Sequence, residues 1–423
     1  MTNYMKRDWR IILITIAALA ALTWFIYSQA DSTGDGPATS VIPAGFSKAV
    51  VASGLNKPRV IVFDARNRML VSELGANQVT IFDSDPAGVL VGRTLIEKLK
   101  SPHGLAFYED ASKQKTYLYV AESQQVTRYI YNLETGTVEL GSRELIAQFS
   151  DNGRHTTRTI GFGPNFRAKP IIDNYLQMET QTAQKLYISV GSSCDACVEE
   201  SWKRGAILES DPPGTFTAEF AGGLRNSVFF TFHPKTGEMW ATEMGRDNLG
   251  DNLPPDEINI VRVATDEHKY GARRYGWPFC YGQQVKDNKF KPNPYTRIDI
   301  PTDCQQTESA YLEIPAHSAP LGLAFVTDKN WPSDWQDDLL VAYHGSWNRS
   351  EPTGYKIVRF VLDADGNPVK DAAGKPLVED FLVGWLDGGK VSGRPVDLKF
   401  NQGSLYISDD YAGVVYRVTP QTN

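Results

Sequence analysis

A pair of short apolar segments recurs six times along this 423-residue chain, and the first segment of each pair carries a polar residue near its start. The first segments lie at residues 58–63, 102–107, 157–162, 226–232, 320–325 and 394–400. The second segments begin at Met69, Tyr117, Lys185, Glu238, Asp338 and Ser404. Repeats of roughly 40–50 residues with four strands each are typical of β-propellers. The sequence therefore predicts an all-β fold, a six-bladed β-propeller of four-stranded antiparallel blades.

Two features outside the repeats bear on the predicted ring. Residues 46–52 have the composition of a strand but no repeat of their own, so we expect them to complete the last blade and remove its exposed edge. Residues 244–255 and 270–315 are rich in Gly, Pro and Asp, which predicts loops rather than extra strands. Surface loops on a rigid scaffold often carry the functional site of a protein.

The N-terminal residues predict export. Basic residues within the first ten positions precede an apolar run over residues 11–27, followed by the small-residue pattern Ser28-Gln-Ala30. This order is typical of a secretory signal peptide, and the run is also close in length to a membrane span. We expect a periplasmic protein, soluble or anchored to the inner membrane. The predicted parts are a signal peptide or membrane anchor at 1–30, a linker at 31–42 and the propeller at 43–420.

Charge and cysteine content exclude other classes of function. The formal net charge of −7 offers no basic face for nucleic acid. The four cysteines allow two disulfides in an exported chain, and we expect Cys194 to pair with Cys197 and Cys280 with Cys304. A zinc site is disfavoured, because the two pairs are distant in sequence and lack a nearby His.

Histidines and arginines recur at the starts of the predicted innermost strands. His103 and His317 head two of these strands, and His155 lies just before a third. Comparable positions in four repeats are held by Arg59, Arg158, Arg225 and Arg394. Side chains that converge at one mouth of the channel would form a basic pocket for a small ligand with several negative charges. His155 is then a candidate general base, because the pKa of a His suits proton transfer near neutral pH.

The segment from Glu243 to Glu257 is a second candidate site. Its oxygen ligands in a Gly-rich loop favour a hard cation, Ca²⁺ over Mg²⁺. The ligand spacing differs from that of an EF-hand, so a solvated acidic turn remains the alternative on these residues alone.

Several motifs resemble those of the soluble pyrroloquinoline quinone (PQQ) sugar dehydrogenases. They are Arg225-Asn226 after Gly222-Gly-Leu, Pro255-Asp-Glu-Ile-Asn259 and Tyr275-Gly-Trp-Pro278. The sorbosone/aldose dehydrogenase branch is the most similar by three more motifs, His155-Thr-Thr-Arg, Val190-Gly-Ser-Ser-Cys194 and His344-Gly-Ser-Trp-Asn-Arg349. The resemblance covers residues 43–420.

This resemblance implies an oxidoreductase that uses PQQ and Ca²⁺ to oxidise a hydroxyl or hydrated aldehyde of an aldose or a sorbosone-like sugar. It implies that His155 takes the hydroxyl proton while hydride passes to the quinone, and that Arg225 and Asn226 hold and polarise the quinone oxygens. The carbonyl oxygens of Gly245 and Arg246 would bind the Ca²⁺, which acts as a Lewis acid. The other cofactor-binding residues implied are His103, His317, Arg349 and Arg394.

The resemblance also implies two partners and leaves two alternatives. The partners are a small-molecule sugar and an external electron acceptor, a quinone or a cytochrome, since the chain has no haem-attachment motif. The best-known glucose enzyme of the group has an acidic residue before its catalytic His, where this chain has Arg154. One alternative is a six-bladed Ca²⁺-dependent lactonase, which predicts Glu, Asp and Asn at the inner strand heads. The other is a propeller that only binds a protein or glycan.

Overall fold

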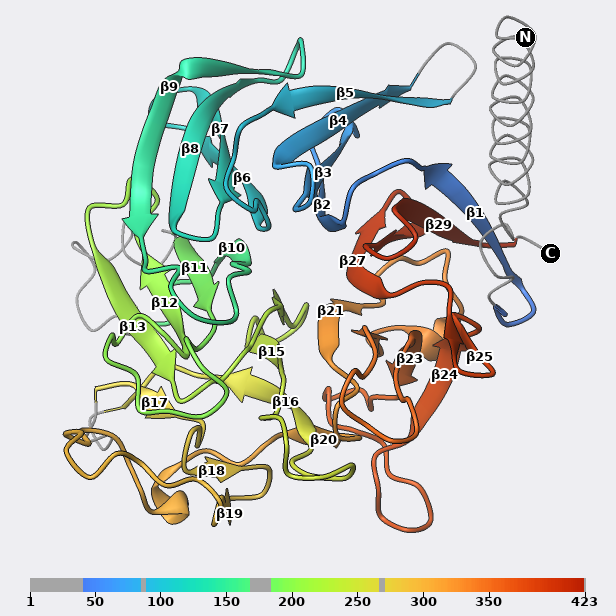
Figure 1. The fold of residues 1–423 in the computed structure, drawn as a ribbon. Coiled ribbons are helices and arrows are strands. Elements are labelled where there is room, and N and C mark those ends of the chain that lie inside the picture. Colours follow the sequence, from blue (N-terminus) through green and yellow to red (C-terminus); the bar gives the residue numbers. More distant parts are fainter. Residues whose placement is uncertain (1–40, 85–88, 168–183, 266–270, 422–423) are drawn as a thin grey trace, which may run out of the picture. The chain divides into compact units, whose positions relative to one another are not determined.

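The six large sheets of the protein stand as blades around a central axis (Figure 1). The structure is a computed structural model that describes residues 41–84, 89–167, 184–265 and 271–421. Within these residues, the six sheets have four or five strands each, and two further sheets have two strands each. The predicted all-β, six-bladed β-propeller is therefore confirmed.

In the first three blades the four main strands follow one another in the chain, from the axis outward, and blade 3 gains a short fifth strand from a later part of the chain. Blade 1 contains β2 (Pro58–Phe63), β3 (Met69–Glu73), β4 (Gln78–Ser84) and β5 (Leu90–Ile96). Blade 2 contains β6 (Leu105–Asp110), β7 (Lys115–Ala121), β8 (Gln125–Asn132) and β9 (Thr137–Gln148). Blade 3 contains β10 (Ile160–Gly163), β11 (Lys185–Val190), β12 (Ala206–Ser210), β13 (Thr217–Gly222) and the short β17 (Arg273–Arg274).

The last three blades follow the same order. Blade 4 contains β14 (Phe230–Phe232), β15 (Met239–Glu243), β16 (Asp256–Val261) and β20 (Leu312–Ile314). Blade 5 contains β21 (Pro320–Phe325), β22 (Leu339–Tyr343), β23 (Lys356–Phe360) and β24 (Val378–Leu382). Blade 6 contains β27 (Pro395–Asn401), β28 (Ser404–Asp409), β29 (Val414–Pro420) and β1 (Phe46–Ala52). Smaller elements are β18 (Cys280–Tyr281), β19 (Val285–Lys286), β25 (Leu386–Asp387), β26 (Lys390–Val391) and the 3-10 turns η1 (Cys304–Gln306) and η2 (Ser333–Trp335).

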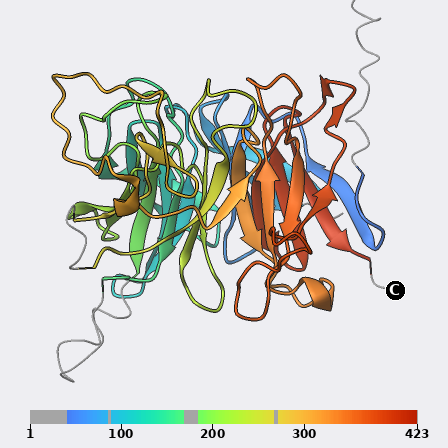
Figure 2. The same ribbon diagram turned by 90° about the horizontal axis from the view of Figure 1, so that it is seen from below.

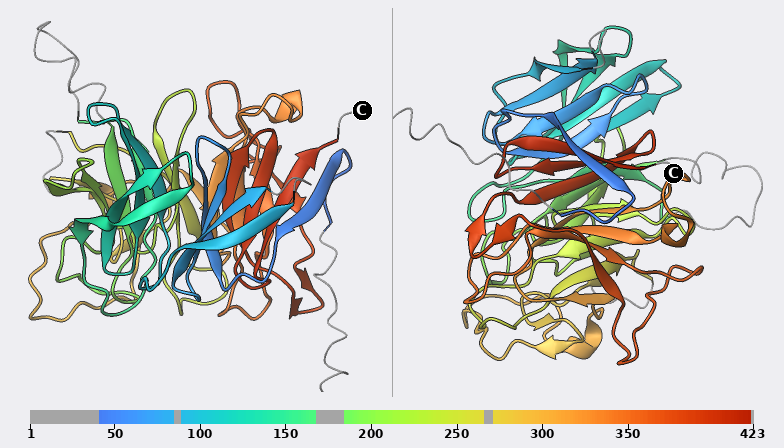
Figure 3. Two further views of the ribbon diagram at one scale, coloured as in Figure 1. Left: turned by 90° about the horizontal axis from the view of Figure 1, so that it is seen from above. Right: turned by 90° about the vertical axis from the view of Figure 1, so that its right-hand side faces the viewer.

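The strand nearest the N-terminus closes the ring. β1 pairs antiparallel with β29, with Phe46 opposite Pro420, so that the two ends of the propeller share one sheet. The right-hand view of Figure 3 shows β1 in blue beside the red strands of blade 6. This confirms the prediction for residues 46–52, and the pairing satisfies backbone groups that would otherwise form an open edge.

The connection between β16 and β20 was only partly predicted. It extends beyond the ends of the strands in the edge-on view of Figure 2, and most of it is irregular. However, the expectation of loop throughout 270–315 was wrong at three places within the described residues. Leu312–Ile314 forms the fourth strand of blade 4, Arg273–Arg274 forms the fifth strand of blade 3, and β18 pairs with β19. Leu312 and Ile314 are buried with exposed Glu313 between them, a short alternation that the Pro- and Asp-rich surroundings hide. Residues 244–255 contain no strand, as predicted.

The second strand of a blade is buried on both faces. Every residue of β3, β15 and β22 is buried, because each blade lies between two others. This explains why these segments read as continuous apolar runs rather than as alternating patterns. β3 and β15 are the exception at their last two positions, where a hydroxyl and a Glu reach other strands or their heads.

A hydroxyl at the next-to-last position of the second strand links four blades to their neighbours. In each case the hydroxyl donates to a backbone carbonyl at the head of the next innermost strand. The pairs are Ser72 to His103, Ser189 to Ser227, Thr242 to Leu321 and Ser408 to Arg59. These buried bonds repeat around the ring and set the position of the strand heads.

The acidic residue that follows holds the head of the innermost strand in its own blade. Glu243 accepts a hydrogen bond from the backbone N–H of Asn226 at 2.9 Å, and Asp409 accepts one from Arg394 at 2.9 Å. Glu73 and Glu122 make the same kind of contact in blades 1 and 2. The repeated sequence pattern that predicts the fold therefore also fixes the backbone of two predicted site residues, Asn226 and Arg394.

Close packing of inner strands constrains one of the channel glycines. The N–H of Gly104 donates to the carbonyl oxygen of Arg158 at 2.9 Å, which joins blade 2 to blade 3. A Cβ at this position would lie 2.5 Å from that oxygen. The approach of the two backbones thus requires glycine.

Both predicted disulfides are confirmed: Cys194 pairs with Cys197 and Cys280 with Cys304. The predicted signal peptide or anchor at 1–30 and most of the linker lie outside the described residues. Among the residues that the structure does describe, none forms a helix with the length and hydropathy needed to cross a bilayer.

Candidate active site

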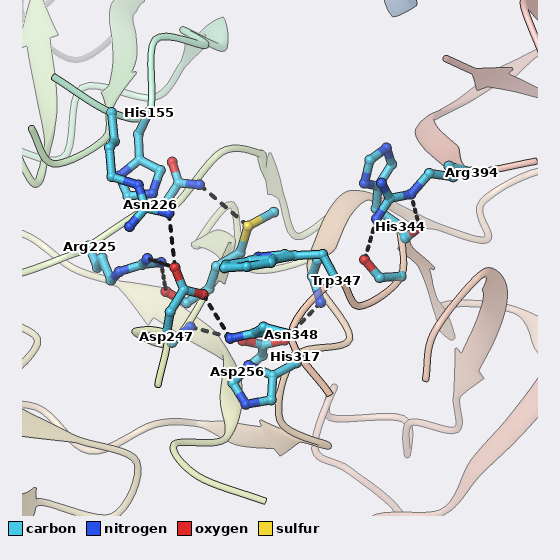
Figure 4. A pocket seen from close by; sticks show the side chains of 15 residues that line it. His155, Arg225, Asn226, Asp247, Asp256, His317, His344, Trp347, Asn348 and Arg394 are labelled. Carbon is cyan, nitrogen blue, oxygen red and sulfur yellow. Dashed lines mark hydrogen bonds and ion pairs between the residues drawn. The ribbon is translucent and has the colours of Figure 1, made fainter. Parts of the chain in front are cut away.

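A cavity of about 350 Å³ opens among the loops that precede the innermost strands and those that follow the second strands of the blades (Figure 4). Its size is within the range of small-molecule and cofactor sites. The structure brings six of the sequence-predicted site residues to its walls: His155, Arg225, Asn226, Gly245, His317 and Arg394. The cavity is also lined by Asp247 and Asp256, which belong to the candidate segment from Glu243 to Glu257, and by residues that were not predicted individually, among them His344, Trp347 and Asn348.

Three predicted site residues lie outside this lining. His103 is fully buried, and its ring packs against Phe229. The guanidinium of Arg246 turns to Asp287, 2.8 Å away, although the predicted role of Arg246 concerns its carbonyl oxygen. Arg349 donates to backbone carbonyls, among them that of Ala316 at 3.1 Å, and so holds neighbouring loops together.

The hydrogen bonds of His155 determine its tautomer. Its Nδ1 lies 2.9 Å from the hydroxyl oxygen and 3.0 Å from the carbonyl oxygen of Ser192. That hydroxyl donates its only hydrogen to the carbonyl oxygen of Cys194 at 2.7 Å. Both Ser192 oxygens therefore act as acceptors, and Nδ1 must carry the proton. The other ring nitrogen, Nε2, keeps its lone pair and can accept a proton.

The surroundings of His155 keep it neutral. Burial, followed by the positive charge of Arg225, lowers the pKa of His155 to about 3. A cationic imidazole is disfavoured both by the loss of water and by the nearby guanidinium groups. At neutral pH the residue is therefore in the base form.

The backbone of His155 is held in an uncommon conformation. Its φ of +52° is in the left-handed region, which is unfavourable for a residue with a Cβ. Arg158 donates to the carbonyl oxygen of His155 at 2.6 Å, and Arg204 donates to that of Arg154 at 2.8 Å. Gly191 lies beside the ring, where an added Cβ would be 2.7 Å from the His155 Cβ and 2.6 Å from the Asn226 side-chain oxygen.

Arg225 is fixed by several acceptors. Its Nε donates to the carbonyl oxygen of Asp195 at 2.9 Å, and its NH2 group donates to the Asp195 carboxylate at 2.8 Å. Asp247 and the carbonyl of Met244 accept longer bonds of 3.3 Å. Figure 4 shows Asp247 between Arg225 and Asn348, whose amide also donates to it at 3.3 Å.

Asp256 organises the acidic wall of the cavity. One carboxylate oxygen accepts from the N–H of Gly245 and the other from that of Ala319, both at 2.8 Å. Burial raises the pKa of Asp256 to about 7. The carboxylate thus fixes the peptide at Gly245, whose carbonyl was predicted to bind a cation.

His344 and Arg394 form the opposite wall. His344 Nε2 lies 2.9 Å from the Asp410 carboxylate. Burial alone would raise the pKa of Asp410, but the His344 hydrogen bond and the charge of Arg59 hold it below its usual value. Arg394 donates to the carbonyls of His344 and Gly345 at 3.0 and 2.5 Å. In the described part of the chain, no carboxylate pairs with the Arg394 guanidinium, so its charge is available to an anion.

One more histidine, His317, and one tryptophan, Trp347, complete the site. His317 has Nε2 2.8 Å from the carbonyl oxygen of Gly250, so that Nε2 is its donor and Nδ1 its acceptor. Trp347 is 69% exposed although it lines the cavity, and Figure 4 shows it between the Arg225 and Arg394 walls. The motif His344-Gly-Ser-Trp-Asn-Arg349 contains Trp347, but sequence reasoning selected only Arg349 from it.

Comparison with known proteins gives a consistent family assignment. A family model described as TrAA12-like matches residues 40–421. An uncharacterised protein of Borreliella burgdorferi is 28% identical over 388 residues, which covers 90% of each chain. A protein of Hypocrea jecorina named pyrroloquinoline quinone-dependent sugar dehydrogenase is 25% identical over 404 residues, 88% of this chain and 87% of the relative.

Solved structures agree with the fold. A Trichoderma reesei carbohydrate-active enzyme of family AA12 superposes with a TM-score of 0.71 at 23% identity, over 91% of this chain and 98% of that chain. At this level of identity the match supports the propeller architecture.

Proposed function

The chain belongs to the TrAA12-like family, and from this premise we propose that it is a quinoprotein oxidoreductase that oxidises a sugar with PQQ as its cofactor. The resemblance in its motifs and the name of its Hypocrea jecorina relative support this function. The observation that carries the proposal is the pairing, in one cavity, of the neutral base His155 with an Arg394 that lacks a carboxylate partner among the described residues.

The charges of the cavity fit a small polyanion such as PQQ. Among the described residues, the hydrogen bonds of the Arg394 guanidinium go to backbone carbonyls, which leaves its charge for a ligand carboxylate. The Asn348 side-chain oxygen is buried and has no hydrogen-bond partner in the described part of the chain, so a donor on a ligand would satisfy it. Arg225 and Asn226 would hold the quinone end, and His317 would complete the pocket. When bound, PQQ supplies the two-electron acceptor of the oxidation.

We assign the proton transfer to His155. Its Nε2 accepts the proton of the substrate hydroxyl, and the two Ser192 oxygens stabilise the resulting imidazolium through Nδ1–H. Because Arg225 contributes to the low pKa of His155, negative charge in the cavity raises that pKa toward the range of an effective base. His155 is thus neutral before the polyanionic cofactor binds and better able to take a proton once the cofactor is in place.

A cation site and a surface that binds the sugar also belong to the proposed function. The carbonyl oxygens of Gly245 and Arg246 would bind Ca²⁺, a hard ion that prefers such ligands. Asp256 fixes the Gly245 peptide for this purpose. The exposed indole of Trp347 offers an apolar face against which a sugar ring can pack.

We further propose that the chain is exported to the periplasm, soluble or anchored to the inner membrane by its N-terminal residues, and that it passes electrons to an external quinone or cytochrome. The apolar run at 11–27 supports export. The absence of a haem-attachment motif from the sequence supports an external acceptor.

The proposal is tested by titrating chelator-treated protein with PQQ, with and without Ca²⁺, and following tryptophan fluorescence. We expect one PQQ per chain, tighter binding with Ca²⁺, and weaker binding by Arg394→Met. Lys203→Met is the matched control, because Lys203 is a cation outside the cavity lining. No binding by the wild-type protein would reject the PQQ proposal and bring forward the lactonase and binding-module alternatives.

A further inference from the structure

The Cys194–Cys197 disulfide closes a short loop beside the candidate active site. The carbonyl oxygen of Cys194 accepts the hydrogen bond from Ser192 that sets the tautomer of His155. The carbonyl oxygen of the next residue, Asp195, accepts a bond from Nε of Arg225 at 2.9 Å. Two successive carbonyls of this loop therefore support the two candidate catalytic side chains.

Asp195 makes the shortest contacts of the Arg225 guanidinium. Its carboxylate accepts from the NH2 group at 2.8 Å, in addition to the bond between its carbonyl and Nε. Two acceptors on one residue fix the plane of the guanidinium, because each nitrogen donates in a defined direction. The same carboxylate oxygen accepts from the backbone N–H of Asp247 at 2.8 Å. The Asp195 carbonyl also accepts from the indole N–H of Trp277 at 3.2 Å.

Asp195 does not line the cavity, so any effect on the reaction must act through the residues that it holds. We propose that Asp195 is a positioning residue, held in place by the Cys194–Cys197 disulfide, that orients Arg225 and the segment 245–247 toward the cofactor. This inference rests on the proposed function of the cavity. It assigns to the disulfide a role in the active site beyond the stapling of a loop.

The disulfide adds a covalent restraint to the hydrogen bonds that hold Asp195. Cross-linking two nearby residues removes conformations in which Asp195 would turn away from Arg225. The second bridge, Cys280–Cys304, spans 24 positions and packs in a separate cluster with Phe279. It provides a matched control for the general effect of losing a disulfide.

The experiment compares Asp195→Ala, Asp195→Asn, Cys194→Ala/Cys197→Ala and Cys280→Ala/Cys304→Ala with the wild-type protein. Three quantities are measured: the Kd of PQQ by fluorescence, the absorption spectrum of bound PQQ, and kcat and KM with an aldose. We expect Asp195→Ala to weaken PQQ binding or lower kcat by about 10- to 100-fold, the effect of losing hydrogen bonds to a charged group, with the sugar KM little changed. Asp195→Asn keeps one side-chain acceptor and the carbonyl, so it should recover most of the loss.

The variants also report whether the disulfide and Asp195 act together. Removing the Cys194–Cys197 bridge should reproduce the Asp195→Ala phenotype, and adding Asp195→Ala to that variant should cause little further loss, because contacting groups are not additive. The Cys280–Cys304 control should keep the wild-type spectrum and kcat. The inference is overturned if Asp195→Ala matches the wild-type protein, or if both disulfide variants lose activity equally. Failure of the wild-type protein to bind PQQ would instead reject the proposed function itself.

Discussion

The Nδ1 atom of His155 lies 2.9 Å from the hydroxyl oxygen of Ser192, and this oxygen must accept the hydrogen bond. Its own hydrogen is given to the carbonyl of Cys194. A serine that accepts in this way serves as an uncharged orienting group for a base. Ser192 keeps the proton of His155 on Nδ1, so that Nε2 is the nitrogen that can accept a proton from the substrate. It does so without a buried carboxylate, whose charge would oppose the lowering of the His155 pKa by Arg225.

Replacing this hydroxyl should weaken the reaction without abolishing it. In Ser192→Ala, the Ser192 carbonyl oxygen still accepts from Nδ1 at 3.0 Å, so the tautomer is retained but less well held. We expect kcat to fall about fivefold, the effect of one net hydrogen bond. Ser193→Ala is the control, because that hydroxyl contacts Glu199 instead. Equal kcat values for Ser192→Ala and the wild-type protein would remove Ser192 from this role.

The low pKa of His155 predicts an unusual acid limb. Burial and Arg225 lower the pKa of His155 from 6.5 to about 3 in the ligand-free protein. The negative charge of bound PQQ raises this pKa from there, so the base is lost between these two values as pH falls. The kcat/KM of the loaded enzyme should therefore change little between about pH 8 and 6.5, and its acid limb should lie below the ordinary value for His. A pH profile from 4 to 8 checks this. An acid limb at or above 6.5 that moves to still higher pH in Ser192→Asp, which places a carboxylate beside Nδ1, would belong to His155 and contradict the low pKa.

Glu257 should make stability fall as pH rises. This residue is fully buried, and burial raises its pKa from 4.5 to about 7. The folded protein keeps the proton between these values while the unfolded chain loses it, so the contribution to stability is present below 4.5 and lost as pH rises toward 7. The loss is about 3 kcal/mol by linkage.

The comparison of Glu257→Gln with wild-type protein isolates this effect. The variant has no proton to lose, so its melting temperature should depend less steeply on pH between 4.5 and 7 than that of the wild-type protein. Glu139→Gln is the control, because Glu139 is exposed. Parallel pH curves for Glu257→Gln and the wild-type protein would rule out the buried, protonated state.

Trp347 should affect the sugar more than the cofactor. Its exposed indole is free to pack against a sugar ring, while the proposed cofactor contacts are those of Arg225 and Arg394, which line the cavity. We expect Trp347→Ala to raise the sugar KM about tenfold, or about 1.4 kcal/mol, and to leave the Kd of PQQ within about twofold. Trp202→Ala is the control, since Trp202 is 50% exposed but outside the cavity lining. A loss of PQQ binding in Trp347→Ala would place the indole with the cofactor instead.

Removal of the cation should stop turnover. Treatment with a chelator should abolish activity, and Ca²⁺ should restore it better than Mg²⁺, because flexible carbonyl ligands suit the larger ion. Asp256→Asn should weaken the restoration, since Asp256 holds the N–H of Gly245. Full activity after prolonged chelation at a raised temperature would exclude a catalytic Ca²⁺ at Gly245.

The fold could be predicted because the same residue types recur at the same strand positions and make the same hydrogen bonds in several blades. The hydroxyl of Thr242 joins blade 4 to blade 5, and Glu243 after it holds the N–H of Asn226. The same two positions recur in other blades. Residues that the repeat places at strand heads, such as Asn226 and Arg394, therefore reach the cavity as expected.

The remaining cavity residues and strand β20 could not be predicted individually, because their positions depend on loop conformations that no sequence pattern indicates. His103 heads an inner strand as predicted but turns into the buried interior, whereas His344, at the end of β22, lines the cavity. Asp247 and Trp347 lie in irregular segments, where neither alternation nor repeat indicates side-chain direction. Strand β20 was hidden for a related reason, because three residues are too few to outweigh the composition around them.

The central claim is that this cavity oxidises a sugar with His155 as the base. The most direct test mixes anaerobic protein, loaded with stoichiometric PQQ and Ca²⁺, with a panel of aldoses and follows the absorbance of the quinone. We predict sugar-dependent reduction in the wild-type protein and, in His155→Gln, normal PQQ binding with a rate at least about 1,000-fold slower. Reduction by His155→Gln at the wild-type rate, or no reduction of wild-type protein by any sugar, would contradict the account.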